Sequence, residues 1–350
     1  MRLGILGYNV NTGIGEMCKT LIEQFSINAF LVSHHTDKTK EVYQPNIPNI
    51  RYCQDWTPND ADLDWLFDNC DIIFTIETDF NSGLFQKAKA RGKKTVLFVM
   101  WEYFYDRYKD ATVLLCTSKK GYEIVDQPNK VYLPWPIDTS KFPFKERGQS
   151  NRIFLHNAGF GGLKNRKGTI EVIKAFFNTI SECPKAKLII NSQKPLSDYK
   201  DDVAPKTNLF NIINIDRRIV WNTKNWPNNI DIYNEGDVYL YPARYDGQAL
   251  VAEEAMACGF PTFVTDAKPM NEFSENPMFK IRVATNTPFR VENHDVNLNI
   301  CDIDDLAKKI IWAYGSDLRD VSHKNREIIE KDFSWNRWKQ EYLALFDKIT

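Results

Sequence analysis

The sequence predicts an α/β protein of two domains, each with a mainly parallel β-sheet covered by helices. Short apolar runs of β type alternate with amphipathic helical segments from the first residue onward. This alternation stops at a proline-containing polar segment, residues 136–150, and then resumes. The chain has 350 residues, and a domain usually contains about 100 to 200 residues.

In the first half, the sequence has six apolar runs typical of strands and three segments typical of helices. The expected strands are residues 2–8, 29–34, 70–77, 95–101, 112–118 and 130–136. The expected helices are residues 15–25, 83–92 and 119–126. Strands that alternate with helices need crossover connections, so we expect a parallel sheet with both faces covered.

The same alternation returns in the second half. The segments that carry it are residues 152–160, 168–180, 186–192, 229–243, 248–259, 261–266 and 303–315, followed by an amphipathic stretch at 325–346. We therefore predict two Rossmann-like domains with their parallel sheets facing across a cleft. The expected boundaries are a first domain at 1–137, a linker at 138–150, a second domain at 151–328, and a C-terminal helix at 329–350 that packs back towards the first domain.

Composition excludes several classes of protein. The formal net charge is −1 and 43% of the residues are apolar, so no global charge draws the chain to nucleic acid or anionic lipid. The densest basic run, residues 87–94, is expected at the end of a helix. There its cations either complement the helix dipole or form a surface for an anionic acceptor or a membrane.

The seven cysteines show no C-x-x-C pair, which disfavours a disulfide framework or a zinc site. We expect them to be reduced and buried. The N-terminus begins directly as a strand, without the apolar core of a signal peptide, and no run of 18 apolar residues is present. A cytoplasmic location is therefore expected.

The first strand is followed by the glycine loop "NVNTGIGEM", where Gly13 and Gly15 would let the backbone approach an anion at a helix N-terminus. A dinucleotide fingerprint would need a third glycine, but Cys18 stands there. This disfavours a nicotinamide dehydrogenase. The alternative interpretation is a tight turn without a ligand.

The second glycine loop, "HNAGFGGLKNRKG", combines Gly159 with Lys164, Arg166 and Lys167 just before a helix. Clustered cations beside a helix N-terminus suit a diphosphate, because its charges need neutralisation where water is partly excluded. The alternative is a solvated basic turn. His156 borders this loop at a strand end.

The stretch "YPARYDGQALVAEEAMACG" places Asp246 in a turn after a strand and Glu254 within the following helix, which is expected to end at Gly259. Open parallel sheets bind ligands at the carboxyl ends of their strands. There both carboxylates can accept hydrogen bonds from sugar or ribose hydroxyls. We expect the adjacent Glu253 to be solvated.

These motifs together resemble a retaining nucleotide-sugar glycosyltransferase of the GT-B fold, similar to glycosyltransferase family 4. That family carries an E-x7-E element, typically with a Gly-Phe-Gly-Leu turn after the first Glu. Here "DGQALVAEE" keeps the spacing but has Asp246 as the first carboxylate. The segments "TGIGEM", "LPWPIDTSKFPF" and "NRKGTIEVIKAF" resemble the family in the same order, so the resemblance spans almost the whole chain.

The resemblance implies roles for individual residues. Glu254 would hold the donor ribose, Asp246 would lie near the transferred sugar and the diphosphate, and Lys167 would offset the charge of the leaving group. Lys164 or Arg166 would replace a family Arg that this loop lacks. The remaining donor contacts would come from the backbone amides of Gly247, Gln248, Ala249 and Leu250.

On the acceptor side the resemblance implies Trp101 and Glu102, within "FVMWEYFYD". No metal or cofactor is implied, and the acidic clusters "DADLD" and "DIDD" are expected to cap helices. The predicted activity is transfer of a sugar from a nucleoside diphosphate sugar to an acceptor hydroxyl, with anomeric retention. The acceptor would be a glycan, a lipid carrier or a modified DNA base. The alternatives are a non-catalytic nucleotide-sugar binding protein, or a GT-B epimerase or phosphorylase.

Overall fold

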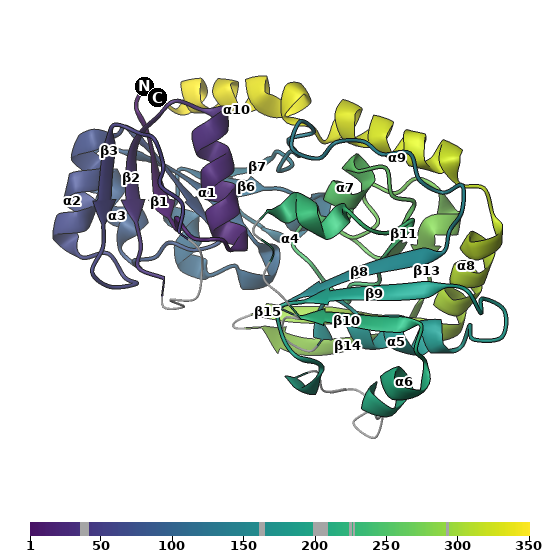
Figure 1. Cartoon of the computed structure of the whole chain (residues 1–350). Coiled ribbons are helices and arrows are strands. Elements are labelled where there is room, and N and C mark those ends of the chain that lie inside the picture. The colour runs from purple at the N-terminus through teal and green to yellow at the C-terminus, as the bar shows by residue number, and fades with distance from the viewer. Residues whose placement is uncertain (36–41, 161–164, 199–208, 224–225, 227, 292–293) are drawn as a thin grey trace. The chain divides into compact units, whose positions relative to one another are not determined.

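The computed structural model describes residues 1–35, 42–160, 165–198, 209–223, 226, 228–291 and 294–350. The chain divides into two compact units (Figure 1). The first unit is built from Met1–Pro134 and Trp338–Thr350, and the second from Trp135–Val291 and Asp295–Arg337. Within the described part of the chain, no helix is both long and apolar enough to cross a membrane.

The first unit has a seven-stranded parallel sheet of order β3-β2-β1-β4-β5-β6-β7. Its strands are β1 Leu3–Gly7, β2 Ile27–Val32, β3 Asn49–Tyr52, β4 Ile72–Ile76, β5 Lys94–Val99, β6 Val113–Cys116 and β7 Lys130–Tyr132. Its helices are α1 Gly13–Gln24, α2 Asp60–Asn69, α3 Leu84–Ala90 and α4 Lys119–Ile124, with 3-10 turns at Trp101–Tyr103 and Asp106–Asp110. All six expected strands are present. The short edge strand β3 was not predicted; three of its residues are half-buried and one is exposed.

Two glycines of β1 let helices pack closely on the sheet. A Cβ on Gly4 would lie 2.6 Å from Cys70 Sγ, after α2, and a Cβ on Gly7 would overlap Cys18 Sγ, in α1. All seven cysteines are free and buried, as the sequence predicted. In the last helix, α10 Trp335–Ile349, the ring of Phe346 packs against Phe25 and Phe74.

The basic run spans the end of α3 and the start of β5, and acidic residues of α2 and its C-terminal flank neutralise it. Arg91 pairs with Asp64 and Asp68 at 2.7 and 2.6 Å, and Lys87 pairs with Asp60. The helix-end interpretation of these cations therefore holds for the described structure. Exposed pairs of this kind add little stability, but they leave less positive charge for an anionic partner.

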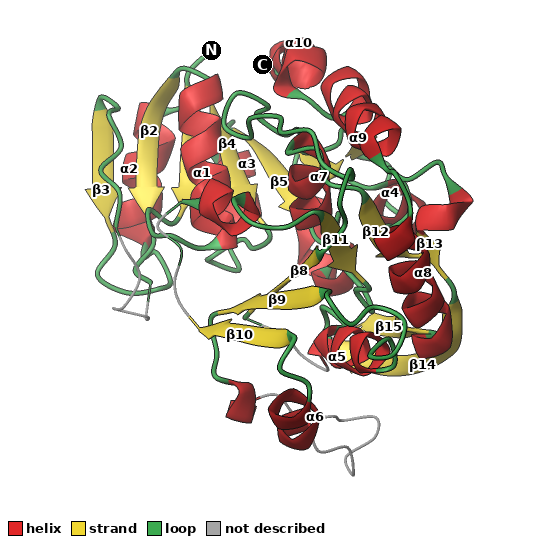
Figure 2. Ribbon diagram, turned by 45° about the vertical axis from the view of Figure 1, so that its right-hand side comes forward, coloured by secondary structure: helices red, strands yellow, loops and turns green. Residues whose placement is uncertain are grey.

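The second unit has a six-stranded parallel sheet of order β10-β9-β8-β11-β12-β13. Its strands are β8 Ile153–Gly159, β9 Lys187–Ser192, β10 Ile219–Thr223, β11 Val238–Tyr241, β12 Thr262–Thr265 and β13 Lys280–Ile281. Its helices are α5 Thr169–Phe177, α6 Leu209–Ile215, α7 Leu250–Ala257, α8 Ile303–Gly315 and α9 Arg319–Asp332, with 3-10 turns at Leu196–Asp198, Asn229–Tyr233 and Pro277–Phe279. A hairpin that was not predicted, β14 Val283–Val291 and β15 His294–Cys301, precedes α8 (Figure 2).

Two hydrophobic clusters cover the two faces of this second sheet. Alternate residues along β11 enter different clusters, since Val238 and Leu240 pack with α5 and α8, whereas Tyr239 and Tyr241 pack with α7. Side chains in a strand point alternately to opposite faces. The sheet is therefore buried on both sides, which explains the continuous apolar runs in its sequence.

Caps define the ends of several helices. Asn59 and Asp62 form a reciprocal capping box at the start of α2, and Asp302 accepts from the amides of Asp304 and Asp305 at the start of α8. The two acidic clusters thus lie at helix N-termini, as predicted. At the other end of α7, Gly259 has φ +83° and its amide bonds to Met256 O at 3.0 Å, which closes the helix.

The predicted linker, residues 138–150, contains a buried arginine. Arg147 is 6% exposed and lies over the ring of Phe260 at 3.7 Å. Its guanidinium donates to the carbonyl oxygens of Tyr233 at 2.7 Å and Cys258 at 3.3 Å. Burial lowers the pKa of Arg147 to about 10. This part of the segment is therefore packed into the second unit.

Candidate functional site

The candidate site lies where the second glycine loop meets the turn after β11. Gly168, directly after Lys167, has φ +70°, and a Cβ on it would overlap the carbonyl oxygen of Pro242. Only glycine accommodates both the left-handed conformation and this close approach. The loop is thereby brought against the chain segment that leads to Asp246.

A buried ion pair joins the same two segments. Arg244, 1% exposed, pairs with Glu171 of α5, and Asn165 donates to the other oxygen of Glu171 at 3.1 Å. The amide of Arg244 also donates to Arg166 O at 2.8 Å. Buried pairs of this kind define geometry more reliably than they add stability. Here they fix the loop of Arg166 and Lys167 relative to the turn.

Four side chains converge as a result, and we call Arg166, Lys167, Tyr241 and Asp246 the cation cluster. Lys167 Nζ lies 2.7 Å from Asp246 Oδ2 and 2.9 Å from Tyr241 Oη. Arg166 Nη1 lies 3.2 Å from Asp246 Oδ1, and the Tyr241 hydroxyl donates to Asp246. The amide of Gly247 donates to Asp246 Oδ1 at 2.8 Å.

The electrostatics of the cation cluster favour an ionised aspartate. Burial alone would raise the pKa of Asp246, but the charges of Lys167 and Arg166 and the hydrogen bonds from Lys167 and Tyr241 outweigh it. They hold the pKa of Asp246 well below its usual range. Two cations beside one carboxylate leave a net positive charge. The Arg166 side chain is 25% exposed, which keeps part of this charge accessible to an anion.

The two adjacent glutamates of α7 lie in different surroundings, because neighbouring helix positions are about 100° apart. Glu254 is half-buried, and the Tyr233 hydroxyl donates to its Oε2 at 2.6 Å. Glu253 is 1% exposed and accepts from Gln248 Nε2 at 3.0 Å. The expectation that Glu253 is solvated was therefore wrong. Burial raises its pKa well above the ordinary value.

Gln248 has a structural role that the sequence did not indicate. Its side-chain amide accepts from Trp135 N at 3.1 Å and donates to Trp135 O at 2.8 Å, in addition to its bond to Glu253. The next residue, Ala249, has φ +76° and precedes Leu250, the first residue of α7. Ala249 thus holds the left-handed conformation that glycine favours.

His156 lies in the middle of β8 and is fully buried. Its ring nitrogens lie 2.8 Å from Leu240 O and 2.9 Å from Thr169 Oγ1. Burial lowers the pKa of His156 to about 4. The neutral ring therefore supports the start of α5, next to Gly168.

Gly13, Gly15, Gly159 and Lys164 were also singled out from the sequence. Gly159 ends β8 with φ +51°, and Lys164 lies outside the described residues. In the first unit, Gly13 is exposed and Gly15 is buried, with its amide 3.2 Å from Thr12 Oγ1. A Cβ on Gly15 would overlap Val10 O, so this glycine is needed for packing.

Trp101 and Glu102 form part of the 3-10 turn after β5. Trp101 is 6% exposed and Glu102 is fully buried. A buried carboxylate is unusual. Their expected role on the acceptor side stays a prediction.

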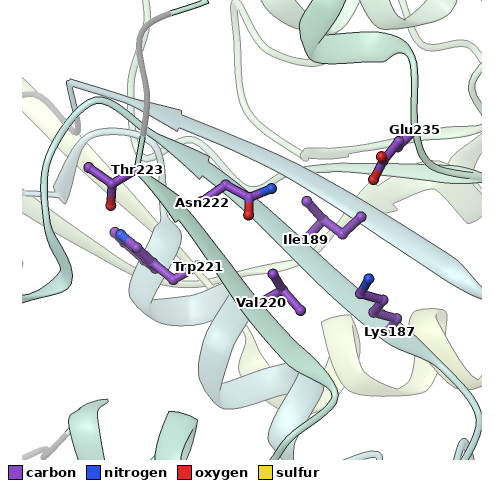
Figure 3. Close-up of a pocket in the computed structure, with 7 residues that line it drawn as sticks. All are labelled: Lys187, Ile189, Val220, Trp221, Asn222, Thr223 and Glu235. Carbon is purple, nitrogen blue, oxygen red and sulfur yellow. The ribbon is translucent and has the colours of Figure 1, made fainter.

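A surface pocket lies elsewhere in the second unit (Figure 3). It has a volume of about 430 Å³ and contains none of the residues predicted to form the site. Its lining comes from β9, β10 and a loop residue: Lys187, Ile189, Val220, Trp221, Asn222, Thr223 and Glu235. The chemistry of the cation cluster therefore gives a better candidate site than this pocket.

Sequence reasoning missed the two tyrosines that bond the site carboxylates, Tyr233 and Tyr241. A usable signal was present in "NIDIYNEGDVYLYPA", which carries three tyrosines in a buried segment. A buried tyrosine hydroxyl usually finds a polar partner. The nearby Asp246 and Glu254 were the available acceptors.

Comparison with known families identifies the second unit. Residues 158–314 match the family described as "Glycosyl transferases group 1". The second unit belongs to the group 1 glycosyl transferases. The match covers the end of β8, the loop of Lys167, β11 and α7, and so contains the whole cation cluster. No curated protein matches the chain significantly.

Solved structures extend the likeness in fold over the whole chain. A glycosyltransferase from Rickettsia africae has a TM-score of 0.70 at 13% identity, with 99% of this chain and 98% of that chain covered. HepE from Anabaena, in complex with UDP and glucose, has a TM-score of 0.72 at 12% identity, with 99% and 100% covered. The sucrose-phosphate synthase from Thermosynechococcus elongatus has a TM-score of 0.71 at 13% identity, with 100% and 99% covered. The fold, with its two parallel sheets, is GT-B-like.

Proposed function

We propose that the protein transfers a sugar from a nucleoside diphosphate sugar to an acceptor hydroxyl, with retention of anomeric configuration. The observation that carries this proposal is the cation cluster, in which Lys167 and Arg166 lie within 3.2 Å of Asp246 beside the N-terminus of α7. A diphosphate leaving group needs such fixed positive charge as its own negative charge grows.

In the proposed mechanism, the bond between the anomeric carbon and the diphosphate oxygen breaks while the acceptor oxygen forms the new bond on the same face. The acceptor proton passes to the departing diphosphate, so no protein nucleophile is needed. Lys167 and Arg166 stabilise the diphosphate, and Arg166 takes the place of the missing family Arg. The position of Arg166 on the second oxygen of Asp246 supports this replacement.

The two carboxylates have separate roles in the proposal. Asp246 holds both cations in position and borders the transferred sugar. Glu254 accepts hydrogen bonds from the donor ribose. The backbone amides of Gly247, Gln248, Ala249 and Leu250, in the turn that leads into α7, contact sugar hydroxyls or phosphate. The amide of Gly247 donates to Asp246 Oδ1 at 2.8 Å and exchanges this bond for the donor.

The nature of the donor and of the acceptor is a further part of the proposal. Structures similar to this chain include HepE with UDP and glucose, which makes UDP-sugars the first donors to test. The acceptor is a glycan, a lipid carrier or a modified DNA base, bound through the first unit. The ion pairs of the basic run with Asp60, Asp64 and Asp68 make a long polyanion the least favoured acceptor.

One observation favours a second candidate function, a nucleotide-sugar binding protein without turnover. Asp246 replaces the first glutamate of the E-x7-E element, and it is engaged by both cations. The aspartate side chain is shorter than that of glutamate. Held by both cations, its carboxylate would extend less far towards a donor sugar. The two functions differ in turnover but share the donor site.

The test is to incubate the protein with UDP-, GDP- and ADP-sugars and to measure slow release of the nucleoside diphosphate, with and without EDTA. We expect release from at least one donor, undiminished by EDTA. Binding of a donor without any release would support the binding protein. Absence of both binding and release for all donors would contradict the proposed function.

A further inference from the structure

Tyr233 makes a direct contact with Glu254. It is the last residue of the 3-10 turn Asn229–Tyr233, 21 positions before Glu254. Its hydroxyl lies 2.6 Å from Glu254 Oε2 and 3.0 Å from Val251 O. The shorter distance to the carboxylate is typical of a charge-assisted hydrogen bond.

Packing holds the ring of Tyr233 in place. The residue is 1% exposed, and its ring contacts those of Phe142, Tyr239 and Phe260, with centroids 6.0 to 6.2 Å apart. Its carbonyl oxygen accepts the bond from Arg147 Nη2 at 2.7 Å. Both the ring and the backbone of Tyr233 are therefore fixed by the core.

The hydroxyl of Tyr233 remains a donor over a wide pH range. Burial, and next the neighbouring charge of Glu254, raise the pKa of Tyr233 well above its ordinary value. Phenylalanine would fill the same space with the same ring. The only added capacity of tyrosine here is the hydrogen bond that its hydroxyl makes.

We propose that Tyr233 is a positioning residue that fixes the carboxylate of Glu254 where it meets the ribose hydroxyls of the donor. This inference rests on the proposed function, because it assigns Glu254 to the ribose. A glutamate side chain has three rotatable bonds, so a half-buried carboxylate on a helix samples several orientations. A rigid partner from the core selects one of them before the donor binds.

The test compares the affinity of the whole protein for UDP and for 2′,3′-dideoxy-UDP by calorimetry, with the ADP and GDP pairs measured in parallel. Wild type should prefer the nucleotide that has the ribose hydroxyls. Tyr233→Phe should lose about tenfold in affinity for that nucleotide and almost nothing for the dideoxy analogue. A general structural defect would weaken both nucleotides equally.

Tyr239→Phe is the matched control, since it removes another fully buried tyrosine hydroxyl from the same core. It should keep the preference of the wild type. The double variant Tyr233→Phe, Glu254→Ala should show the same preference for UDP over 2′,3′-dideoxy-UDP as Glu254→Ala alone. This lack of an added effect would show that Tyr233 acts through Glu254.

The outcomes separate this inference from the proposed function. If wild type prefers the ribose nucleotide and folded Tyr233→Phe keeps the full preference, the inference is overturned and the proposed function stands. If wild type binds none of the nucleotides, both are overturned. Should Tyr233→Phe not fold, Glu254→Asp draws the carboxylate away from Tyr233, and full preference in that variant would equally overturn the inference.

Discussion

Lys167 Nζ lies 2.7 Å from Asp246 Oδ2, although 79 positions separate the two residues in the sequence. The contact depends on Gly168, whose lack of a side chain lets the second glycine loop reach Pro242. It also depends on the Arg244–Glu171 pair behind it. A site for an anionic group is thereby assembled from two loops at the carboxyl ends of β8 and β11.

Replacing Lys167 tests the role of its charge. Lys167→Met should lower nucleoside diphosphate release by about 10² to 10³ fold, because one preorganised charge on a leaving group is worth that much. Circular dichroism should show that the variant is folded. Lys187→Met, in the pocket of Figure 3, is the matched control and should turn over at the wild-type rate. Equal rates for the two folded variants would contradict the assignment.

Asp246→Asn should destabilise the protein by about 2 kcal/mol at pH 7, because it leaves two partly buried cations without their carboxylate. The pKa of Asp246 is lowered in the folded state. Its contribution is therefore present above the unfolded pKa of about 3.9 and is lost as the pH falls below it. Urea unfolding at pH 7, 5, 3.5 and 2.5 should show a difference from wild type that stays constant down to about pH 5 and shrinks below about pH 4. A difference that does not change with pH would count against the ionised Asp246.

Glu253→Gln should change stability with the opposite pH dependence. The pKa of Glu253 is raised in the folded state, so its contribution is fully present below the unfolded pKa of about 4.3 and is lost as the pH rises through the folded value. Glutamine imitates the protonated acid and can still accept from Gln248. The variant should therefore gain stability relative to wild type between pH 5 and pH 8. A stability difference between the variant and wild type that stays constant over this range would contradict protonation of Glu253 in the folded protein.

Gln248→Ala should cost about 2 kcal/mol or more, because it leaves the peptide groups of Trp135 and the carboxyl of Glu253 buried without this partner. Gln86→Ala removes a comparable hydrogen bond at an exposed site, to Asp110. Its effect should stay below about 0.5 kcal/mol. Denaturant midpoints of the two variants give the comparison, and similar midpoints would show that the Gln248 network is not stabilising.

Much of the fold could be predicted from the sequence, because a buried parallel sheet leaves continuous apolar runs between helices. The cation cluster could also be anticipated, since glycine beside cations before a helix has a clear physical use. Lys167, Arg166 and Asp246 come together in the second unit. The hairpin β14–β15 was not predicted because it has no continuous apolar run: the described residues of β14 are mostly exposed, and β15 alternates buried Val296 and Leu298 with polar residues.

The partners of the carboxylates could not be predicted in the same way. Glu253 and Glu254 are adjacent in the sequence, and only the packing of α7 decides that one is buried and the other half-buried. Gln248 bonds to Trp135, which is 113 positions away. Contacts of this range depend on the tertiary structure, and no local pattern in the sequence encodes them.

The central claim is that the cation cluster binds the diphosphate of the donor, and a crystal structure with the nucleoside diphosphate released in the screen tests it most directly. We predict phosphate oxygens within about 3 Å of Lys167 Nζ, with the ribose hydroxyls on Glu254. A diphosphate bound elsewhere, for example beside Lys187 in the pocket of β9 and β10, would contradict the claim.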